Sequence, residues 1–198
     1  MSAEQSPIRN VLLVGLGGHG VLSLSRIVAE GALAAGFDVR KSEIHGMSQR
    51  RGSVVSEVRY GGVVHSPLIP GRGADLLLSL ELLEALRHLD RLRPDGVLLV
   101  NDQRITPAPT GPVEYPEDAV ERLRELVPNV RVLPAHDVAA GMGEPRATNM
   151  VMLGAFAAIT PEIDTEVWVQ IIDRAFRPDL RSVNLAAFRR GLELASGA

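Results

Sequence analysis

The residues VLLVGLGGHG, from Val11 to Gly20, constrain the fold of this chain more than any other stretch. An apolar run suited to a buried strand leads directly into a glycine-rich turn. The residues after the turn, 21–36, place apolar side chains on one stripe of a helix that we expect to end at Gly36. A strand, a tight turn and a helix in immediate succession are typical of α/β proteins with a parallel sheet.

The glycines of this turn follow the spacing G-x-G-x-x-G, at Gly15, Gly17 and Gly20. A turn without side chains lets backbone N–H groups approach a phosphate, and the helix that follows adds the positive end of its dipole. We therefore expect an anion site at this turn. The alternative is a structural role, in which the glycines only permit close packing of strand and helix.

The rest of the chain continues the alternation of strands and helices. We expect a hairpin in which residues 53–60 and 63–67 pair around Gly61-Gly62. Further strands are expected at 37–44, 74–80, 97–101 and 130–135. Helices are expected at 117–126 and at 81–92, the latter closed by Pro94-Asp95-Gly96. Loops are expected at 106–116 and 136–147. Three C-terminal helices are expected at 149–159, capped by Thr148, after Thr160-Pro161-Glu162, and at 182–195. The fold class is α/β, with a Rossmann-like, mostly parallel sheet flanked by helices, an inserted β-hairpin and C-terminal helices.

The composition fits one domain that spans residues 1–198, because 45% hydrophobic residues can fill its core. A net charge of −3 gives no general basic field, so neither nucleic acid nor an anionic membrane is expected as a partner. The chain has no cysteine, and its five histidines lack paired ligand spacing, so no metal site is expected. Without a signal pattern or a long apolar run, we expect a cytoplasmic protein.

A basic segment follows the expected second strand. Between Arg40 and Arg59 there are five basic and two acidic residues, in a chain whose total charge is negative. Arg50-Arg51-Gly52 could hold a pyrophosphate between guanidinium groups, with a solvated loop as the alternative. Arg40-Lys41 stands where a dinucleotide enzyme usually has an acidic residue, so this pair could meet the ribose phosphate of NADP or the 3′-phosphate of coenzyme A.

Five segments carry a resemblance to a known family. They resemble the gamma-type subunits of 2-oxoacid:ferredoxin oxidoreductases, most closely those of the indolepyruvate enzymes, and they lie in order at residues 15–33, 42–61, 65–70, 74–89 and 147–156. The block HGMSQR and the element SPLIP are the most specific of these matches. The family usually has glutamine in place of His19 and a second glycine in place of Arg51.

The resemblance implies a divided enzyme. A larger alpha subunit would hold thiamine diphosphate and the iron–sulfur clusters, decarboxylate an arylpyruvate-type 2-oxoacid and pass electrons to ferredoxin. This chain would complete the active site and help to bind coenzyme A, which receives the acyl group, and would be inactive without its partner. Its lack of cysteine agrees with this division.

The resemblance also implies which residues contact the coenzyme. They are Gly17, Gly18, His19 and Gly20 in the turn, and Ser48, Gln49, Arg50, Arg51 and Gly52 in the basic loop. His45 is a candidate catalytic residue that could face the thiamine pocket or the thiol of the coenzyme, although it could instead organise its loop. Two other functions stay open from the sequence: an NADP-binding reductase and a non-catalytic assembly subunit.

Overall fold

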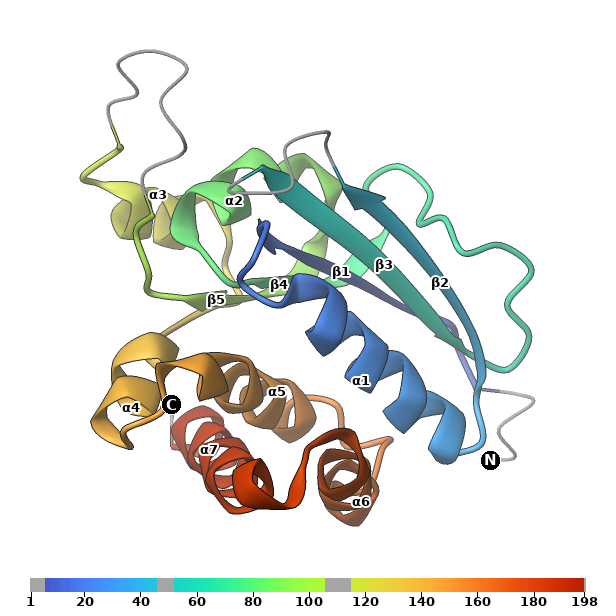
Figure 1. Ribbon diagram of the computed structural model, residues 1–198. Helices are drawn as coiled ribbons and strands as arrows, with labels where there is room; N and C mark the ends of the chain where they lie inside the picture. The colour runs from blue at the N-terminus through green and yellow to red at the C-terminus, as the bar shows by residue number, and fades with distance from the viewer. Residues whose placement is uncertain (1–5, 46–51, 106–114, 198) are drawn as a thin grey trace.

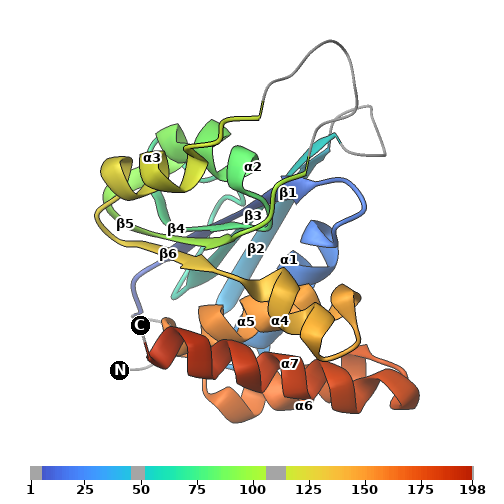
Figure 2. The same ribbon diagram turned by 90° about the vertical axis from the view of Figure 1, so that its left-hand side faces the viewer.

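The computed structural model of this chain describes residues 6–45, 52–105 and 115–197. They form one six-stranded sheet with helices on both faces (Figures 1 and 2). The order of the strands across the sheet is β2-β3-β1-β4-β5-β6. Their bounds are β1 (Arg9–Leu16), β2 (Asp38–His45), β3 (Ser53–Gly61), β4 (Ala74–Ser79), β5 (Leu92–Asn101) and β6 (Val130–Leu133).

The helices divide into two layers, one on each face of the sheet (Figure 2). One layer holds α2 (Leu82–Arg87) and α3 (Ala119–Leu126). The other holds α1 (Val21–Ala34), α4 (Ala135–Gly141), α5 (Thr148–Ala158), α6 (Thr165–Ala175) and α7 (Pro178–Ser196). Short 3-10 turns at 89–91 and 145–147 complete the described secondary structure.

Strand β1 explains why the first apolar run is continuous. Successive side chains of a strand point to opposite faces, and here both faces are covered. Val11 and Leu13 pack in the core beneath α1 and the C-terminal helices, whereas Leu12 and Val14 pack in the core beneath α2 and α3. The carboxyl end of β1 is thereby fixed from both sides, which gives the glycine turn a rigid base.

The predicted fold class is confirmed, with one change in the position of the hairpin. Strands β1, β4, β5 and β6 are parallel neighbours, and the antiparallel hairpin pairs β2 with β3. The predicted partner of β3, residues 63–67, forms no strand. Both edges of β3 are already occupied, by β2 on one side and by β1 on the other, so no edge is left for it.

Two further predictions about local structure were wrong. Pro94-Asp95-Gly96 does not close a helix, because it lies inside β5, which begins at Leu92. Residues 136–147 are not one loop, because they contain most of α4 and a 3-10 turn. Ala135 and Ala139 are fully buried there, and this packing stabilises a short helix despite the glycines that follow.

The predicted helix starts near the C-terminus also need correction. Thr148 is the first residue of α5 and not its cap, since its hydroxyl donates to the carbonyl of Pro145. The helix expected after Thr160 begins at Thr165, where the Asp164 carboxylate accepts the N–H of Glu166. The predicted loop at 106–116 lies outside the described residues up to position 114.

Helices α5 and α7 approach so closely that only glycine fits at their crossing. A Cβ at Gly154 would overlap the backbone carbonyl oxygen of Phe188, and a Cβ at Gly191 would overlap that of Val151. This close approach buries α5 on nearly every side, because β5 lies on its other flank. The N-terminus of α5 is therefore held firmly against the sheet.

We predict that Gly154→Ala lowers the free energy of unfolding by about 2 kcal/mol or more, because backbone atoms must move to admit the methyl group. The matched control is Gly141→Ala at the end of α4, where an added Cβ has no neighbour within 4 Å. Urea denaturation of both variants measures the difference. Equal stabilities would contradict the packing described here.

Candidate functional site

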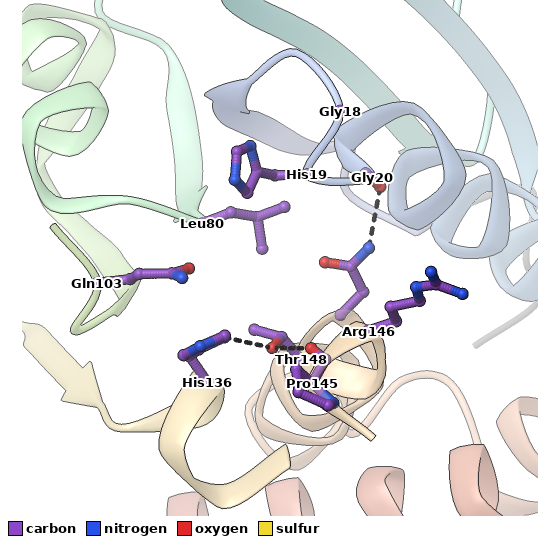
Figure 3. Close-up of a pocket in the computed structure, with 10 residues that line it drawn as sticks. Gly18, His19, Gly20, Leu80, Gln103, His136, Pro145, Arg146 and Thr148 are labelled. Atoms are coloured by element: carbon purple, nitrogen blue, oxygen red, sulfur yellow. Dashed lines mark hydrogen bonds between the residues drawn. The ribbon is translucent and has the colours of Figure 1, made fainter. Parts of the chain in front are cut away.

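A pocket of about 430 Å³ opens at the carboxyl ends of the four parallel strands (Figure 3). Each strand is followed by a residue or turn that lines it, and the start of α5 closes it. The lining residues are Gly18, His19, Gly20, Leu80, Gln103, His136, Pro145, Arg146, Thr148 and Asn149. Ligands of open α/β sheets bind outside the carboxyl ends of the strands, so this pocket is the candidate site.

The glycine turn forms one wall of the pocket. Gly18 and Gly20 have φ angles of 91° and 82°, a left-handed conformation that residues with side chains rarely adopt. Gly15 lies beneath, where an added Cβ would come within 2.8 Å of Val21. The turn is closed by a 3.1 Å hydrogen bond from the N–H of His19 to the carbonyl of Leu16.

Two helices begin at this pocket, α1 after Gly20 and α5 at Thr148. Neither helix has a side-chain cap or an acidic residue in its first turn. The positive end of the α1 dipole is therefore not neutralised by its own sequence. Before α5, the carboxylate of Glu144 caps the preceding 3-10 turn and accepts the backbone N–H of Arg146 over 3.2 Å. The guanidinium of Arg146 adds a full positive charge at the rim and pairs with no carboxylate of the described residues. The pocket favours an anion.

Asn149 joins the two helix starts. Its Nδ2 donates to the carbonyl of Gly20 over 3.3 Å, and a Cβ on Gly20 would overlap that same nitrogen. Gly20 is thus needed both for its backbone conformation and for the close approach of Asn149. In the glycine turn, the Nδ1 of His19 is buried and has no hydrogen-bond partner within the described part of the chain.

The structure brings part of the predicted site together. Gly18, His19 and Gly20 line the pocket, and the N–H of Gly17 donates to the carbonyl of Gly52 over 2.8 Å, which joins the turn to the end of the basic loop. The other predicted loop residues, Ser48, Gln49, Arg50 and Arg51, lie outside the described residues. The backbone of His45 ends β2, and its role stays a prediction.

The predicted site did not include seven of the pocket residues: Leu80, Gln103, His136, Pro145, Arg146, Thr148 and Asn149. A signal for three of them was available. Leu80, Gln103 and His136 come within three residues of the ends of β4, β5 and β6, where an α/β sheet binds its ligands.

Arg40 and Lys41 lie away from the glycine turn. They belong to β2, and β3 separates that strand from β1, so the pair is about 9 to 10 Å from β1 instead of one strand spacing. The guanidinium of Arg40 pairs with Asp38 at 2.5 Å, and the ammonium of Lys41 pairs with Glu43. Both cations already have an acidic partner.

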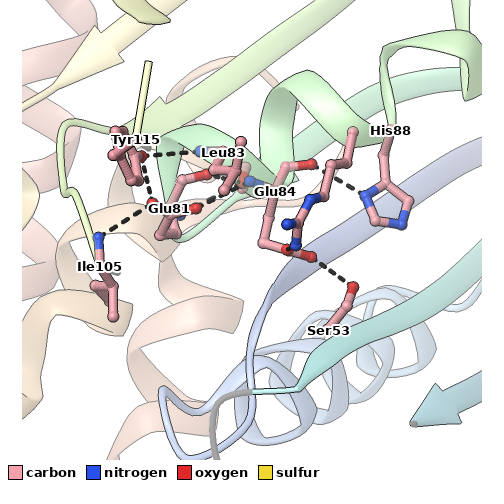
Figure 4. A network of polar contacts seen from close by, with 9 residues as sticks. Ser53, Glu81, Leu83, Glu84, His88, Ile105 and Tyr115 are labelled. Carbon is pink, nitrogen blue, oxygen red and sulfur yellow. Dashed lines mark hydrogen bonds and ion pairs between the residues drawn. The ribbon is translucent and has the colours of Figure 1, made fainter. Parts of the chain in front are cut away.

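Two buried carboxylates support the pocket from behind (Figure 4). Glu84 is fully buried and accepts hydrogen bonds from Ser53 at 2.5 Å and from Arg87 at 2.6 Å. Glu81 caps α2 and accepts from the N–H of Ile105 at 3.2 Å and from the hydroxyl of Tyr115. Since Ser53 follows Gly52 and Glu81 follows Leu80, these bonds fix backbone next to the pocket.

Among the described residues, no group of three or more histidine, cysteine or acidic side chains is placed to hold a metal ion. Within the same ranges, no helix combines the length and the apolar character that crossing a membrane requires.

Comparison with known proteins identifies the family. Residues 10–194 match the model of the pyruvate ferredoxin/flavodoxin oxidoreductase family. The chain is 36% identical over 187 residues to indolepyruvate oxidoreductase subunit IorB of Archaeoglobus fulgidus, with 92% of each chain covered. It is 37% identical over 193 residues to the subunit of the same name from Methanothermobacter thermautotrophicus, and this alignment covers 94% of this chain and 97% of the relative. This chain belongs to the pyruvate ferredoxin/flavodoxin oxidoreductase family.

Solved structures of two ferredoxin oxidoreductases share the fold. The gamma subunit of the keto/oxoacid ferredoxin oxidoreductase from Geobacter sulfurreducens superposes with a TM-score of 0.73 at 24% identity, covering 96% of this chain and 99% of that one. The 2-oxoglutarate:ferredoxin oxidoreductase of Magnetococcus marinus, solved with 2-oxoglutarate, coenzyme A and succinyl-CoA, superposes with a TM-score of 0.75 at 21% identity. The match covers 96% of this chain but only 31% of that longer chain.

We predict that Gly20→Ala destabilises the oxidoreductase chain more than Gly18→Ala does, by about 1 to 2 kcal/mol. Both substitutions place a side chain at positive φ, but only the first also forces Asn149 away. Urea denaturation of the two variants gives the comparison. If Gly18→Ala is equally or more destabilising, the contact with Asn149 does not set the requirement at Gly20.

The two tyrosines of the chain give a prediction for alkaline pH. Burial, together with the carboxylate of Glu162, raises the pKa of Tyr60, and burial together with Glu81 raises the pKa of Tyr115. Because the unfolded state releases these protons first, stability should fall as the pH rises above the ordinary phenol pKa of about 10. Tyrosinate absorbance should therefore appear only together with unfolding, as monitored by circular dichroism. The single variants Tyr60→Phe and Tyr115→Phe show which ring responds, and tyrosinate formed by both rings in the folded chain would contradict the prediction.

Proposed function

We propose that this chain is the small, coenzyme A-binding subunit of an indolepyruvate-type 2-oxoacid:ferredoxin oxidoreductase. In this assignment, a larger subunit decarboxylates an arylpyruvate such as indolepyruvate and passes electrons to ferredoxin. The present chain completes the active site and holds coenzyme A, which leaves as acyl-CoA. The proposal is supported by the names of the relatives and by the pocket at the carboxyl ends of the strands.

The observation that carries the proposal is the meeting of two helix N-termini and Arg146 in one pocket. Coenzyme A contains a pyrophosphate and a 3′-phosphate, and such groups bind to helix N-termini, to glycine-turn N–H groups and to guanidinium groups. The residues present fit this ligand. The related structure from Magnetococcus marinus names coenzyme A among its ligands, which gives the proposal independent support.

The basic loop extends this site in our proposal. The hydrogen bond from Gly17 to Gly52 places the end of that loop beside the glycine turn, so Ser48, Gln49, Arg50 and Arg51 are assigned to the phosphates of the same coenzyme. His45 is assigned to the end that faces the larger subunit. His19, in place of the glutamine usual in the family, offers a ring nitrogen in the same wall.

The division of chemistry follows from the side chains that this subunit contains. It has no cysteine, so its own thiolates cannot hold an iron–sulfur cluster, and we assign the clusters and thiamine diphosphate to the larger subunit. Thiamine diphosphate supplies the carbanion chemistry there. The residues of the present chain bind and orient the coenzyme beside it.

The coenzyme A assignment is favoured over an NADP-binding reductase by the position of Arg40 and Lys41. Both are engaged with acidic neighbours, and β3 separates their strand from β1. It is favoured over a purely structural assembly role by the unneutralised N-terminus of α1 and the guanidinium of Arg146, since a subunit that only docks has no need of a positive pocket.

The test is calorimetric titration of coenzyme A and, separately, NADPH into the complex with the larger subunit. We expect saturable binding of coenzyme A, and Arg146→Ala should raise its Kd by roughly tenfold because a charge-assisted phosphate contact is lost. The matched control is Arg189→Ala, an exposed arginine of α7 away from the pocket, which should leave the Kd unchanged.

Gel filtration of the same complexes separates binding from assembly. If Arg146→Ala prevents the subunits from associating, while the isolated variant chain binds coenzyme A with the same Kd as the isolated unmodified chain, the site docks the partner. Binding of NADPH without binding of coenzyme A would overturn the proposed function.

A further inference from the structure

Asn101 occupies a special place behind the pocket. It is fully buried and is the last residue of β5, which lies between β4 and β6 in the sheet. Neighbouring strands are about 4.8 Å apart, so a side chain at the end of the middle strand can reach the segments that follow both neighbours. Those segments carry Leu80 and His136, which line the pocket.

The side-chain amide of Asn101 forms hydrogen bonds to the segments that follow β4, β5 and β6. Its Oδ1 accepts the N–H of His136 over 3.1 Å. Its Nδ2 donates to the carbonyl of Leu80 over 3.2 Å and to Oε1 of Gln103 over 3.1 Å. A backbone carbonyl can only accept and a backbone N–H can only donate, so these two partners fix which end of the amide is oxygen.

The same network extends to the start of α5. The hydroxyl of Thr148 donates to the carbonyl of Pro145 over 2.7 Å and lies 3.4 Å from Nδ1 of His136 (Figure 3). Because the single hydroxyl hydrogen is used by Pro145, the histidine ring donates from Nδ1 in this contact. Four segments of the pocket wall are thereby connected to one buried amide.

We propose that Asn101 is the positioning residue of the coenzyme pocket. It is not among the residues that line the cavity, so it acts by holding Leu80, Gln103 and His136 in register across from the glycine turn. This inference rests on the proposed function, because the ligand whose affinity reports on the wall is coenzyme A. Loss of the amide leaves the His136 N–H and the Leu80 carbonyl to seek other partners, which displaces the wall.

The sharpest variant is Asn101→Asp, which has nearly the same size and keeps the acceptor for His136. It cannot donate, and it sets a carboxylate oxygen against the backbone carbonyl oxygen of Leu80, which can only accept. The matched control is Asn184→Asp on α7, a buried asparagine whose Nδ2 donates to the carbonyl of Leu180 over 2.8 Å away from the pocket. Both variants are measured as complexes with the larger subunit.

We expect Asn101→Asp to raise the Kd and the KM for coenzyme A on the order of tenfold relative to Asn184→Asp, with kcat at saturating coenzyme nearly unchanged. A general loss of stability would not produce this split, and melting temperatures of both complexes are recorded to compare them. Equal coenzyme affinities of the two variants would overturn the positioning role.

The outcomes also separate this inference from the function on which it rests. If the unmodified complex does not bind coenzyme A, the proposed function is wrong. If it binds and Asn101→Asp binds equally well, only the positioning role is wrong. Should Asn101→Asp fail to fold, the second variant is Asn101→Ser, whose hydroxyl can hydrogen-bond to one of the three partners. It should raise the Kd for coenzyme A several-fold, and an unchanged Kd in that variant would overturn the positioning role.

Discussion

The contact between Gly20 and Asn149 joins the two halves of the site. Gly20 ends the turn after β1, and Asn149 lies in the first turn of α5, 129 residues later in the chain. Their 3.3 Å hydrogen bond brings the N-termini of α1 and α5 to one pocket. The close packing of α5 against α7 and the burial of β1 on both faces hold the two helix starts together. Either helix start alone would offer an anion only one dipole.

The antiparallel strand β3 distinguishes this sheet from a plain dinucleotide-binding arrangement. It lies between β1 and β2, and so it moves the end of β2 away from the glycine turn. The start of β3 lies beside the turn instead. There the carbonyl of Gly52 accepts the N–H of Gly17, and the hydroxyl of Ser53 donates to the buried carboxylate of Glu84. Gly52, the last residue of the basic segment 48–52, therefore lies beside the glycine turn, which in our proposal binds the phosphates of the coenzyme.

Local patterns in the sequence predicted the local parts of this structure well. The strand, turn and helix from Val11 to Ala34 depend on neighbouring residues, and they form as predicted. The predicted pairing of β3 with residues 63–67 was wrong because the pairing of a strand depends on which of its edges other strands occupy. The far wall of the pocket was missed for a related reason, since Gln103, His136 and Asn149 meet only when separate strand ends and α5 are brought together.

The measurement that tests this account most directly is an experimental structure of the complex with its larger subunit and coenzyme A. The account predicts density for the coenzyme pyrophosphate at the starts of α1 and α5, within hydrogen-bond distance of the turn at Gly18–Gly20 and beside Arg146. Coenzyme density confined to the larger subunit, with this pocket filled by solvent at saturating ligand, would contradict it.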